Sequence, residues 1–403
     1  MRRMTGNRPL PAFSRIFVFL VLMMRFPILR FFLAFPCILF PFITDAQTVP
    51  EPILAAKSWV LVDHATGQAL TGNDPDGRVE PASLTKLMTT YLTFAALKAG
   101  TISEEQAVPV SERAWRQEGS RMYIEPRRQV TVGELIRGII VQSGNDACVA
   151  LAELLASSEE AFAGLMNREA ERLGMRNTRF VNSTGMHDPE HYTSARDLAL
   201  LASAIIRDFP EYYGLYSIKS YTYNGIEQHN RNRLLWLDPT VDGMKTGHTR
   251  AAGYCLVSTA KRGPRRLVAV VLGAASESVR AQESLKLLNY GFQFYDTVRL
   301  YSAGQSLSRF RVWKGREDEV DAGFPQDFIL SLPRDRPNRI ESVLESRQPV
   351  LAPLTKGQEI GTLKLTIDGE TYGRYPVVAL QDVPLAGFFG RLRDAIALWF
   401  KRL

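Results

Sequence analysis

At residues 81–90 the chain reads Pro-Ala-Ser-Leu-Thr-Lys-Leu-Met-Thr-Thr, and this segment predicts the start of a helix. Ser83 would lie at the positive end of the helix dipole, and Lys86, three residues later, would share its face. A serine hydroxyl is a weak nucleophile until a neighbouring group accepts its proton. An amine can accept it if burial or a second cation lowers its pKa from about 10.4 toward neutrality. The spacing therefore predicts a nucleophilic serine, although Ser-x-x-Lys alone is weak evidence.

A second polar segment, Ser143-Gly-Asn145, joins two stretches with helical periodicity. A tight loop between helices can place polar groups into a cleft. Ser143 could then relay protons, and Asn145 could bind a substrate amide. If the segment stood alone, we would interpret it as a turn followed by a helix N-cap.

A third segment, Asp242-Gly-Met-Lys-Thr-Gly-His-Thr249, leads into a predicted strand. Lys245 supplies positive charge and Thr246 a hydroxyl for an anionic group. Gly247 has no side chain, so a substrate backbone could lie flat against this strand edge. Alone, this segment would be typical of an exposed hairpin.

The order of the three segments carries more information than any one of them. Ser143 follows Ser83 by 60 residues, and Lys245 follows Ser143 by 102. The set resembles that of the penicillin-recognising serine enzymes. Within them the chain is similar to the low-molecular-weight penicillin-binding proteins that act as D-alanyl-D-alanine carboxypeptidases. The resemblance covers essentially the whole mature chain and includes residues 180–186, 230–232, 243–257 and 280–292.

The resemblance implies a reaction and a role for each matching residue. Ser83 would attack the penultimate D-alanine carbonyl of a peptidoglycan pentapeptide and form an acyl-enzyme, and β-lactams would be covalent inhibitors of the same serine. Lys86 would be the base, although the acylation base is disputed among related enzymes. No metal or other cofactor is implied. The remaining roles are a proton and charge network for Ser143 and Lys245, peptide binding for Asn145, an oxyanion hole from the backbone N–H groups of Ser83 and His248, and carboxylate binding for Thr246 and Arg280.

Periodicity predicts the fold class. Residues 48–297 mix helices and strands in an order typical of an α+β domain, an antiparallel sheet covered by helices. This is the transpeptidase and β-lactamase-like fold that the resemblance implies. Residues 299–383 are short alternating segments separated by Pro, Gly and Asp, which predicts a small all-β sandwich. The predicted strands of the first domain are 57–63, 253–259 and 265–273, and its predicted helices are 83–97, 132–141, 146–155, 161–173 and 194–206.

The two ends of the chain carry its positive charge. The formal net charge is +7, but residues 1–46 contribute six arginines and one aspartate, and the last twenty residues four cations and one aspartate. The body is therefore close to neutral, which argues against a nucleic-acid partner. Residues 1–46 have the layout of a secretory signal peptide cut after Ala46, with Met24 as a plausible start. We expect an exported protein on the periplasmic side of the inner membrane.

The last segment, residues 384–403, predicts an amphipathic helix that lies in the membrane surface. Its apolar residues recur every three or four positions, and its middle is charged, which disfavours a spanning helix. A helix docked on its own domain is the alternative. The predicted apolar face consists of Phe388, Phe389, Leu392, Ile396, Trp399, Phe400 and Leu403.

Several other functions are disfavoured by the sequence. His187-Asp-Pro-Glu-His191 has a proline between its histidines and so lacks the helical face of a zinc peptidase. A second Ser-x-x-Lys, at residues 258–261, leaves a strand and enters a turn, so we interpret it as coincidence. A serine β-lactamase remains an alternative, but no Glu-x-x-Leu-Asn loop precedes Lys245. A catalytically silent wall-binding protein on the same fold is a second alternative. Whether Cys148 and Cys255 form a disulfide is left open.

Overall fold

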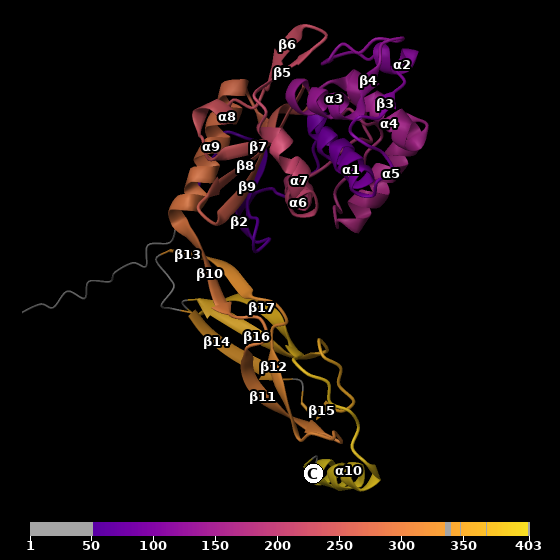
Figure 1. The fold of residues 1–403 in the computed structure, drawn as a ribbon. Helices are drawn as coiled ribbons and strands as arrows, with labels where there is room; N and C mark the ends of the chain where they lie inside the picture. Colours follow the sequence, from indigo (N-terminus) through magenta and orange to yellow (C-terminus); the bar gives the residue numbers. More distant parts are fainter. Residues whose placement is uncertain (1–50, 335–339, 347, 368, 402–403) are drawn as a thin grey trace, which may run out of the picture. The chain divides into compact units, whose positions relative to one another are not determined.

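The computed structural model describes residues 51–401, except 335–339, 347 and 368 (Figure 1). The predicted signal peptide lies outside the described residues. The first part of the described chain contains a five-stranded antiparallel sheet with the order β2-β1-β9-β8-β7. The predicted α+β class is therefore confirmed. The strands are β1 Ser58–Asp63, β2 Ala69–Asn73, β7 Val241–Thr249, β8 Gly253–Arg262 and β9 Arg265–Ala274.

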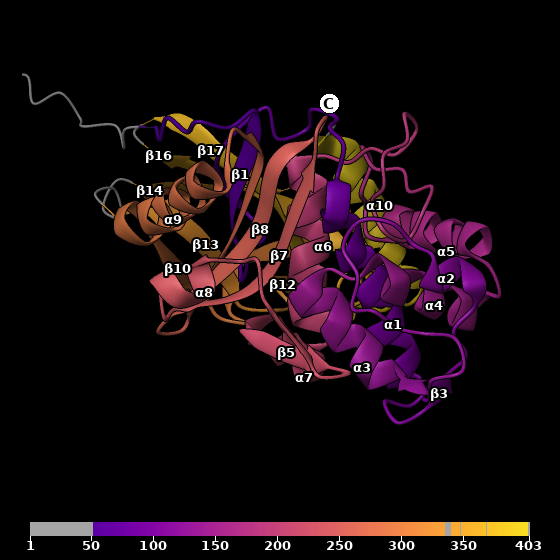
Figure 2. The same cartoon turned by 90° about the horizontal axis from the view of Figure 1, so that it is seen from above.

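Helices cover both faces of this sheet. In Figure 2, α9 lies on one side of β8 and α6 on the other. Both helices contact β9. Burial on both faces explains why the central strands are nearly continuous apolar runs. The longer helices are α1 Lys86–Lys98, α3 Val132–Arg137, α4 Asn145–Ala156, α5 Glu159–Arg172, α6 Ala195–Asp208 and α9 Glu277–Phe294, and the shorter ones are α2 Glu112–Trp115, α7 Pro210–Tyr213 and α8 Leu234–Leu237.

Serine side chains set where three of the helices begin. Ser158, Ser194 and Ser276 accept hydrogen bonds from the third backbone N–H of α5, α6 and α9, respectively. Such caps satisfy amides that have no partner inside the helix. Because of its cap, α5 begins at Glu159, two residues before its predicted start. Two small antiparallel pairs complete this part of the chain, β3 Ala107–Val108 with β4 Val130–Thr131, and β5 Ser220–Tyr223 with β6 Ile226–His229.

The second part of the described chain is rich in β-strands, as predicted, and has its own apolar core. Residues 299–313 and 319–332 each include parts of two strands, which are separated at residues 302–305 and 324–327. One turn has Gly304 at φ +70°, which glycine adopts without strain. A six-stranded sheet has the order β14-β16-β17-β12-β11-β15, and β10 pairs with β13. The strands are β10 Tyr295–Tyr301, β11 Ser306–Trp313, β12 Glu319–Gly323, β13 Phe328–Pro333, β14 Ile340–Ser346, β15 Val350–Leu351, β16 Glu359–Ile367 and β17 Glu370–Ala379.

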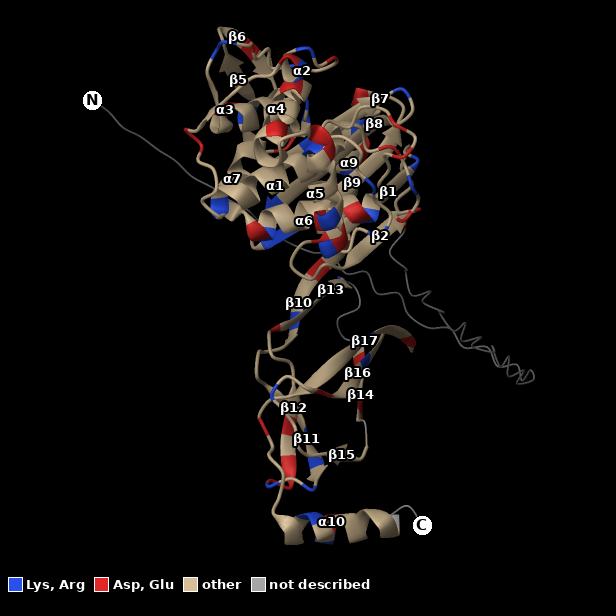
Figure 3. Ribbon diagram, turned by 90° about the vertical axis from the view of Figure 1, so that its right-hand side faces the viewer, with Lys and Arg blue, Asp and Glu red and all other residues tan. Residues whose placement is uncertain are grey.

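The final helix, α10 Phe388–Lys401 (Figure 3), is attached through a buried carboxylate. Asp394 is 3% exposed, and its Oδ2 accepts the backbone N–H of Lys314 at 2.6 Å. Six large apolar side chains of α10 are exposed, and helical spacing places them on the side opposite Asp394. No helix among the described residues is long and apolar enough to cross a membrane. The exposed residues, which we call the tail apolar face, are Phe388, Phe389, Leu392, Ile396, Trp399 and Phe400.

Candidate active site

The first predicted pair meets at the start of α1. Ser83 lies in a 3-10 turn, Ala82–Thr85, directly before the helix. Lys86 is fully buried, and its Nζ lies 2.9 Å from Ser83 Oγ. The amine also donates to the backbone carbonyl of Thr184 at 2.5 Å. One helical turn thus brings a hydroxyl and a buried amine into direct contact, as the spacing predicts.

Burial lowers the pKa of Lys86 to about 8. Desolvation is the main cause because a buried ammonium loses its hydration. Arg231 lowers the pKa further, whereas Cys148, Asp146 and Glu159 raise it. Near neutral pH a useful fraction of this amine is therefore uncharged and able to accept a proton.

The second predicted pair lies beside the first. Ser143 adopts φ +68° directly after a π-helical turn, Gly138–Gln142, and this left-handed backbone reverses the chain before α4. Lys245 Nζ donates to Ser143 Oγ at 2.9 Å and to the carbonyl of Thr246 at 3.0 Å. Burial, and then the nearby Lys86, hold the pKa of Lys245 well below its ordinary value. Two serine–lysine pairs thus lie side by side.

Asn145 begins α4, but its side chain is held by its neighbours. Its Nδ2 donates to the carbonyl of Glu118 at 2.6 Å and lies 3.5 Å from Met186 Sδ. The next residue, Asp146, is buried and accepts the backbone N–H groups of residues 122–124. The sequence analysis did not single out Asp146. An acid in the first turn of a helix was the only available signal.

Strand β7 forms the other wall of the site, at the edge of the sheet. A Cβ on Gly247 would lie 3.0 Å from the carbonyl oxygen of Pro81 and 3.2 Å from Leu84. The glycine therefore allows β7 to pack against the Ser83 turn. This packing is a reason for Gly247 besides the predicted access for a substrate backbone.

A cavity of about 520 Å³ opens between these elements. It is lined by Ser83, Ser143, Thr246, Gly247, His248 and Arg280 among the predicted residues, with Lys86 and Lys245 buried behind the two serines. Several further residues that line the cavity were not predicted from the sequence, although residues 230–232, which contain Arg231, were part of the family resemblance. These are Arg121, Tyr123, Arg231, Tyr254 and Glu277.

Arg280 is poised for an anionic ligand. The residue is 2% exposed, and burial lowers the pKa of its guanidinium. Its Nη2 donates to the carbonyl of Arg231 at 3.3 Å, whereas its buried Nε has no hydrogen-bond partner among the described residues. Glu277 Oε1 lies 3.7 Å from Nη2, so a substrate carboxylate would share this guanidinium with a carboxylate that is already present.

The remaining candidates from the sequence lie apart or have structural partners. Ser258 and Lys261 both lie on β8, where residues three apart point to opposite faces, so this second copy forms no pair. His191 Nε2 bonds Thr85 Oγ1 at 2.8 Å, whereas His187 contacts Glu80. Cys148 and Cys255, whose pairing was left open, are buried free thiols.

Comparison with known proteins identifies the class of this architecture. The crystal structure of penicillin binding protein 5 from Haemophilus influenzae is 40% identical, with a TM-score of 0.80 over 84% of this chain and 100% of that chain. Penicillin-binding protein D2 from Listeria monocytogenes, solved with ampicillin, is 31% identical, with a TM-score of 0.56 over 60% of this chain and 99% of that chain.

The sequence matches are more specific. The D-alanyl-D-alanine carboxypeptidase family model, peptidase S11, matches residues 45–276, and that of the penicillin-binding protein 5 C-terminal domain matches residues 295–385. The carboxypeptidases DacC and DacA of Escherichia coli are 42% and 43% identical over 88% and 87% of this chain, and 90% and 89% of their own lengths. The chain belongs to the D-alanyl-D-alanine carboxypeptidase family, as the resemblance indicated, rather than to either alternative.

A substitution at Gly185 tests how closely the loop after Asn182 packs against the 3-10 turn that contains Ser83. It has φ +84°, and a Cβ there would lie 1.8 Å from the carbonyl oxygen of Ala82. We expect Gly185→Ala to lower the free energy of unfolding by about 3 kcal/mol or more, since strain and overpacking add. The matched control is Gly174→Ala. Gly174 has φ +79° with nothing within 4 Å of its Cβ, so only about 1 kcal/mol is expected.

Urea unfolding of both variants measures this difference. Equal losses in the two variants would contradict close packing at Gly185.

Proposed function

We propose that this enzyme removes the terminal D-alanine from peptidoglycan pentapeptides through an acyl-enzyme on Ser83. The observation that carries the proposal is the 2.9 Å contact between Ser83 Oγ and a fully buried Lys86 amine. Burial lowers the pKa of this amine to about 8, which matches the requirement for a general base near neutral pH.

In the acylation step, the uncharged Lys86 amine accepts the proton of Ser83 as Oγ bonds to the carbonyl carbon of the penultimate D-alanine. The backbone N–H groups of Ser83 and His248 stabilise the negative oxygen that develops. Breaking the peptide bond releases D-alanine, whose amine takes up the proton that Lys86 had accepted, relayed through the Ser143 hydroxyl, which lies 2.9 Å from Lys245 Nζ. Lys86 is then uncharged again. Water, activated by Lys86, then hydrolyses the ester and restores Ser83.

Substrate binding would use the edge of β7. Thr246 and Arg280 hold the terminal carboxylate, and the position of both residues in the cavity lining supports this role. Asn145 binds the peptide in this scheme, which requires its amide to exchange its contact with the Glu118 carbonyl for one with substrate. An extended peptide would add to the open edge of β7 beside Gly247.

The same serine would be acylated by β-lactams. Structures of the Listeria monocytogenes relative are known with ampicillin and with cefotaxime bound. Opening of the lactam ring transfers its acyl group to Ser83 Oγ and leaves the amine tethered, so the adduct persists.

We place the enzyme outside the cytoplasm, on the periplasmic side of the inner membrane. The leader-like composition of residues 1–46 supports export. The tail apolar face, with Trp399 and two phenylalanines at its start, supports insertion into the membrane surface, and Arg391 and Arg393 would contact anionic headgroups.

Ser83 is the residue we expect a penicillin to modify. Intact mass after incubation should increase by one drug molecule, and peptide mapping should place it on the segment containing Ser83. Ser83→Ala should abolish both the adduct and D-alanine release. The matched control is Ser258→Ala in the second Ser-x-x-Lys copy, which should retain activity. A drug adduct on another residue would refute the assignment.

The pKa of Lys86 predicts the pH dependence of acylation. Because the uncharged amine is the base, and its pKa is lowered to about 8, the acylation rate should rise with pH and level off above that value. Below it, the rate should fall about tenfold per pH unit. Stopped-flow measurement of acylation by a fluorescent penicillin between about pH 6 and about pH 10 determines this part of the pH profile, which we call the acid limb. A rate that does not change across this range would exclude Lys86 as the base.

Membrane binding should depend on the tail apolar face. Replacing Phe388, Phe389, Trp399 and Phe400 by serine should reduce the binding to anionic phospholipid vesicles at least about a hundredfold, since each aromatic loses its buried area. Val343→Ser with Leu351→Ser, two exposed apolar residues elsewhere in the β-rich part, is the control. Vesicle co-sedimentation of the mature chain checks this, and equal binding of both variants would disprove anchoring.

A further inference from the structure

The second hydrogen bond of Lys86 goes to the loop 182–186. Its acceptor is the Thr184 carbonyl, 2.5 Å from Nζ. Asn182 shapes this loop from inside, since its Oδ1 accepts the backbone N–H groups of Thr184 and Gly185, at 3.2 and 2.7 Å. Its Nδ2 donates to the carbonyl of Met186. The loop is therefore a compact unit whose position determines where the Thr184 carbonyl lies.

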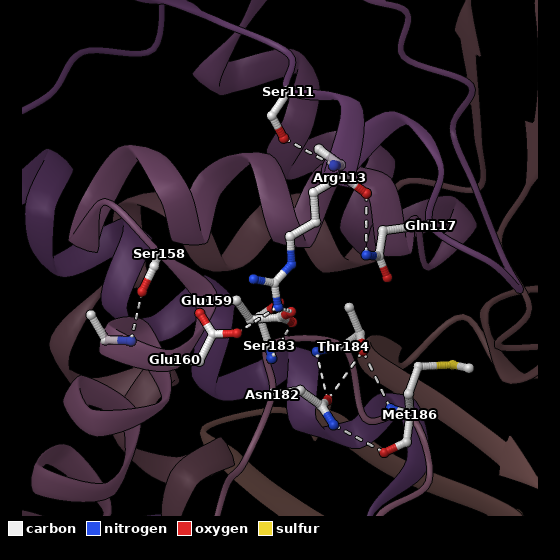
Figure 4. A network of polar contacts seen from close by, with 12 residues as sticks. Ser111, Arg113, Gln117, Ser158, Glu159, Glu160, Asn182, Ser183, Thr184 and Met186 are labelled. Carbon is white, nitrogen blue, oxygen red and sulfur yellow. Dashed lines mark hydrogen bonds and ion pairs between the residues drawn. The ribbon is translucent and has the colours of Figure 1, made fainter.

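One carboxylate fixes this loop from outside (Figure 4). Glu159, the first residue of α5, is 6% exposed. Its Oε1 accepts both the backbone N–H of Ser183 at 3.0 Å and the Ser183 hydroxyl at 2.7 Å. The carbonyl of Ser183 in turn accepts the Thr89 hydroxyl at 2.7 Å, one turn beyond Lys86 on α1. Ser183, adjacent to Thr184, is thus held on two sides.

The other oxygen of Glu159 faces a second segment of the site. Arg113 Nη2 donates to Glu159 Oε2 at 2.8 Å, and it also pairs with the exposed Glu160 at 2.9 Å. Arg113 lies on α2, and Glu118, three residues after that helix ends, provides the carbonyl that accepts from Asn145. Glu159 therefore joins the loop behind Lys86 to the segment that holds Asn145.

We propose that Glu159 is a positioning residue for acylation, holding loop 182–186 so that the Thr184 carbonyl orients the Lys86 amine toward Ser83. An uncharged amine has two N–H groups and one lone pair. When one N–H is directed at Thr184, the lone pair can accept the Ser83 proton. The inference rests on the proposed roles of Ser83 and Lys86. Glu159 itself touches neither side chain and acts through Ser183 and Thr184.

The charge of Glu159 gives the proposal a measurable signature. Glu159 raises the pKa of Lys86 because an anion favours the ammonium form. Removing that charge should therefore lower the pKa and move the acid limb of acylation to lower pH. Other groups around Lys86 remain unchanged in such a variant. They are Asp146 and Cys148 on α4, Arg231 before α8, Lys245 on β7 and His191 after the loop.

Two substitutions separate position from charge. In Glu159→Gln the amide oxygen still accepts from Ser183. The amide NH2 group cannot accept from Arg113, so that hydrogen bond is lost, while Arg113 keeps its ion pair with Glu160. At pH values above the acid limb, we expect the acylation rate to be within about twofold of the wild-type rate. The acid limb itself should shift to lower pH. Glu159→Ala removes the acceptor, so the loop loses its outer attachment. We expect its acylation rate to fall about tenfold or more at every pH, because misplacement of a catalytic group is costly.

Glu160→Gln is the matched control. Glu160 is the next residue, contacts the same arginine and is exposed, but it makes no contact with loop 182–186 among the hydrogen bonds of the described residues. The Glu160→Gln substitution should leave both the acylation rate and the pH of the acid limb unchanged. The measurement is acylation by a fluorescent penicillin against pH on the full chain, with thermal unfolding to verify the fold.

The outcomes separate this inference from the proposed reaction. If Glu159→Ala is folded and acylates like wild type, Glu159 does not position the loop. If Glu159→Ala fails to fold, Glu159→Asp decides, because it keeps the charge but draws the carboxylate back from Ser183 by one methylene group. An acylation rate equal to that of wild type in this variant overturns the proposal. A wild-type adduct on a residue other than Ser83 would instead refute the reaction, irrespective of Glu159.

Discussion

The site depends on the burial of an amine that would be charged in water. Lys86 is fully buried at the start of α1, and the free energy of removing an ammonium from water favours its uncharged form. Its polar contacts limit that cost, because Ser83 and the Thr184 carbonyl both lie within hydrogen-bond distance. Lys86 in turn lowers the pKa of Lys245, a second buried lysine, because two neighbouring ammonium groups repel each other. The rest of the domain excludes water from these groups and holds them close together.

Close approach of backbone segments makes such burial achievable. β7 packs against the Ser83 turn only because Gly247 has no side chain, and the loop at Gly185 passes directly over the Ala82 carbonyl. Ala82 itself, directly before Ser83, has φ +48°, an uncommon conformation for alanine. Strain of this kind persists only where surrounding contacts determine the backbone, as they do here.

Sequence reasoning predicted the fold class and the residues that meet in the cavity, but it missed much of what supports them. Ser83 and Lys86 are one helical turn apart, so local geometry was enough. The Thr184 carbonyl is a backbone group, and a pattern of side chains does not show where a backbone group will lie. Asp146 and Glu159 look like ordinary acids at helix starts, and only the tertiary fold shows that their carboxylates hold loops. The division of residues 299–313 into two strands depended on a turn that alternation alone does not show.

The open edge of β7 has a consequence for how the enzyme could change over time. An added strand is recognised through N–H and C=O groups of the main chain, which every amino acid except proline supplies. Point mutations replace side chains, so they cannot delete these groups one at a time. A compound that relies on the β7 backbone would therefore leave few single point mutations that give resistance, other than a rearrangement of the strand on which we propose that the substrate binds.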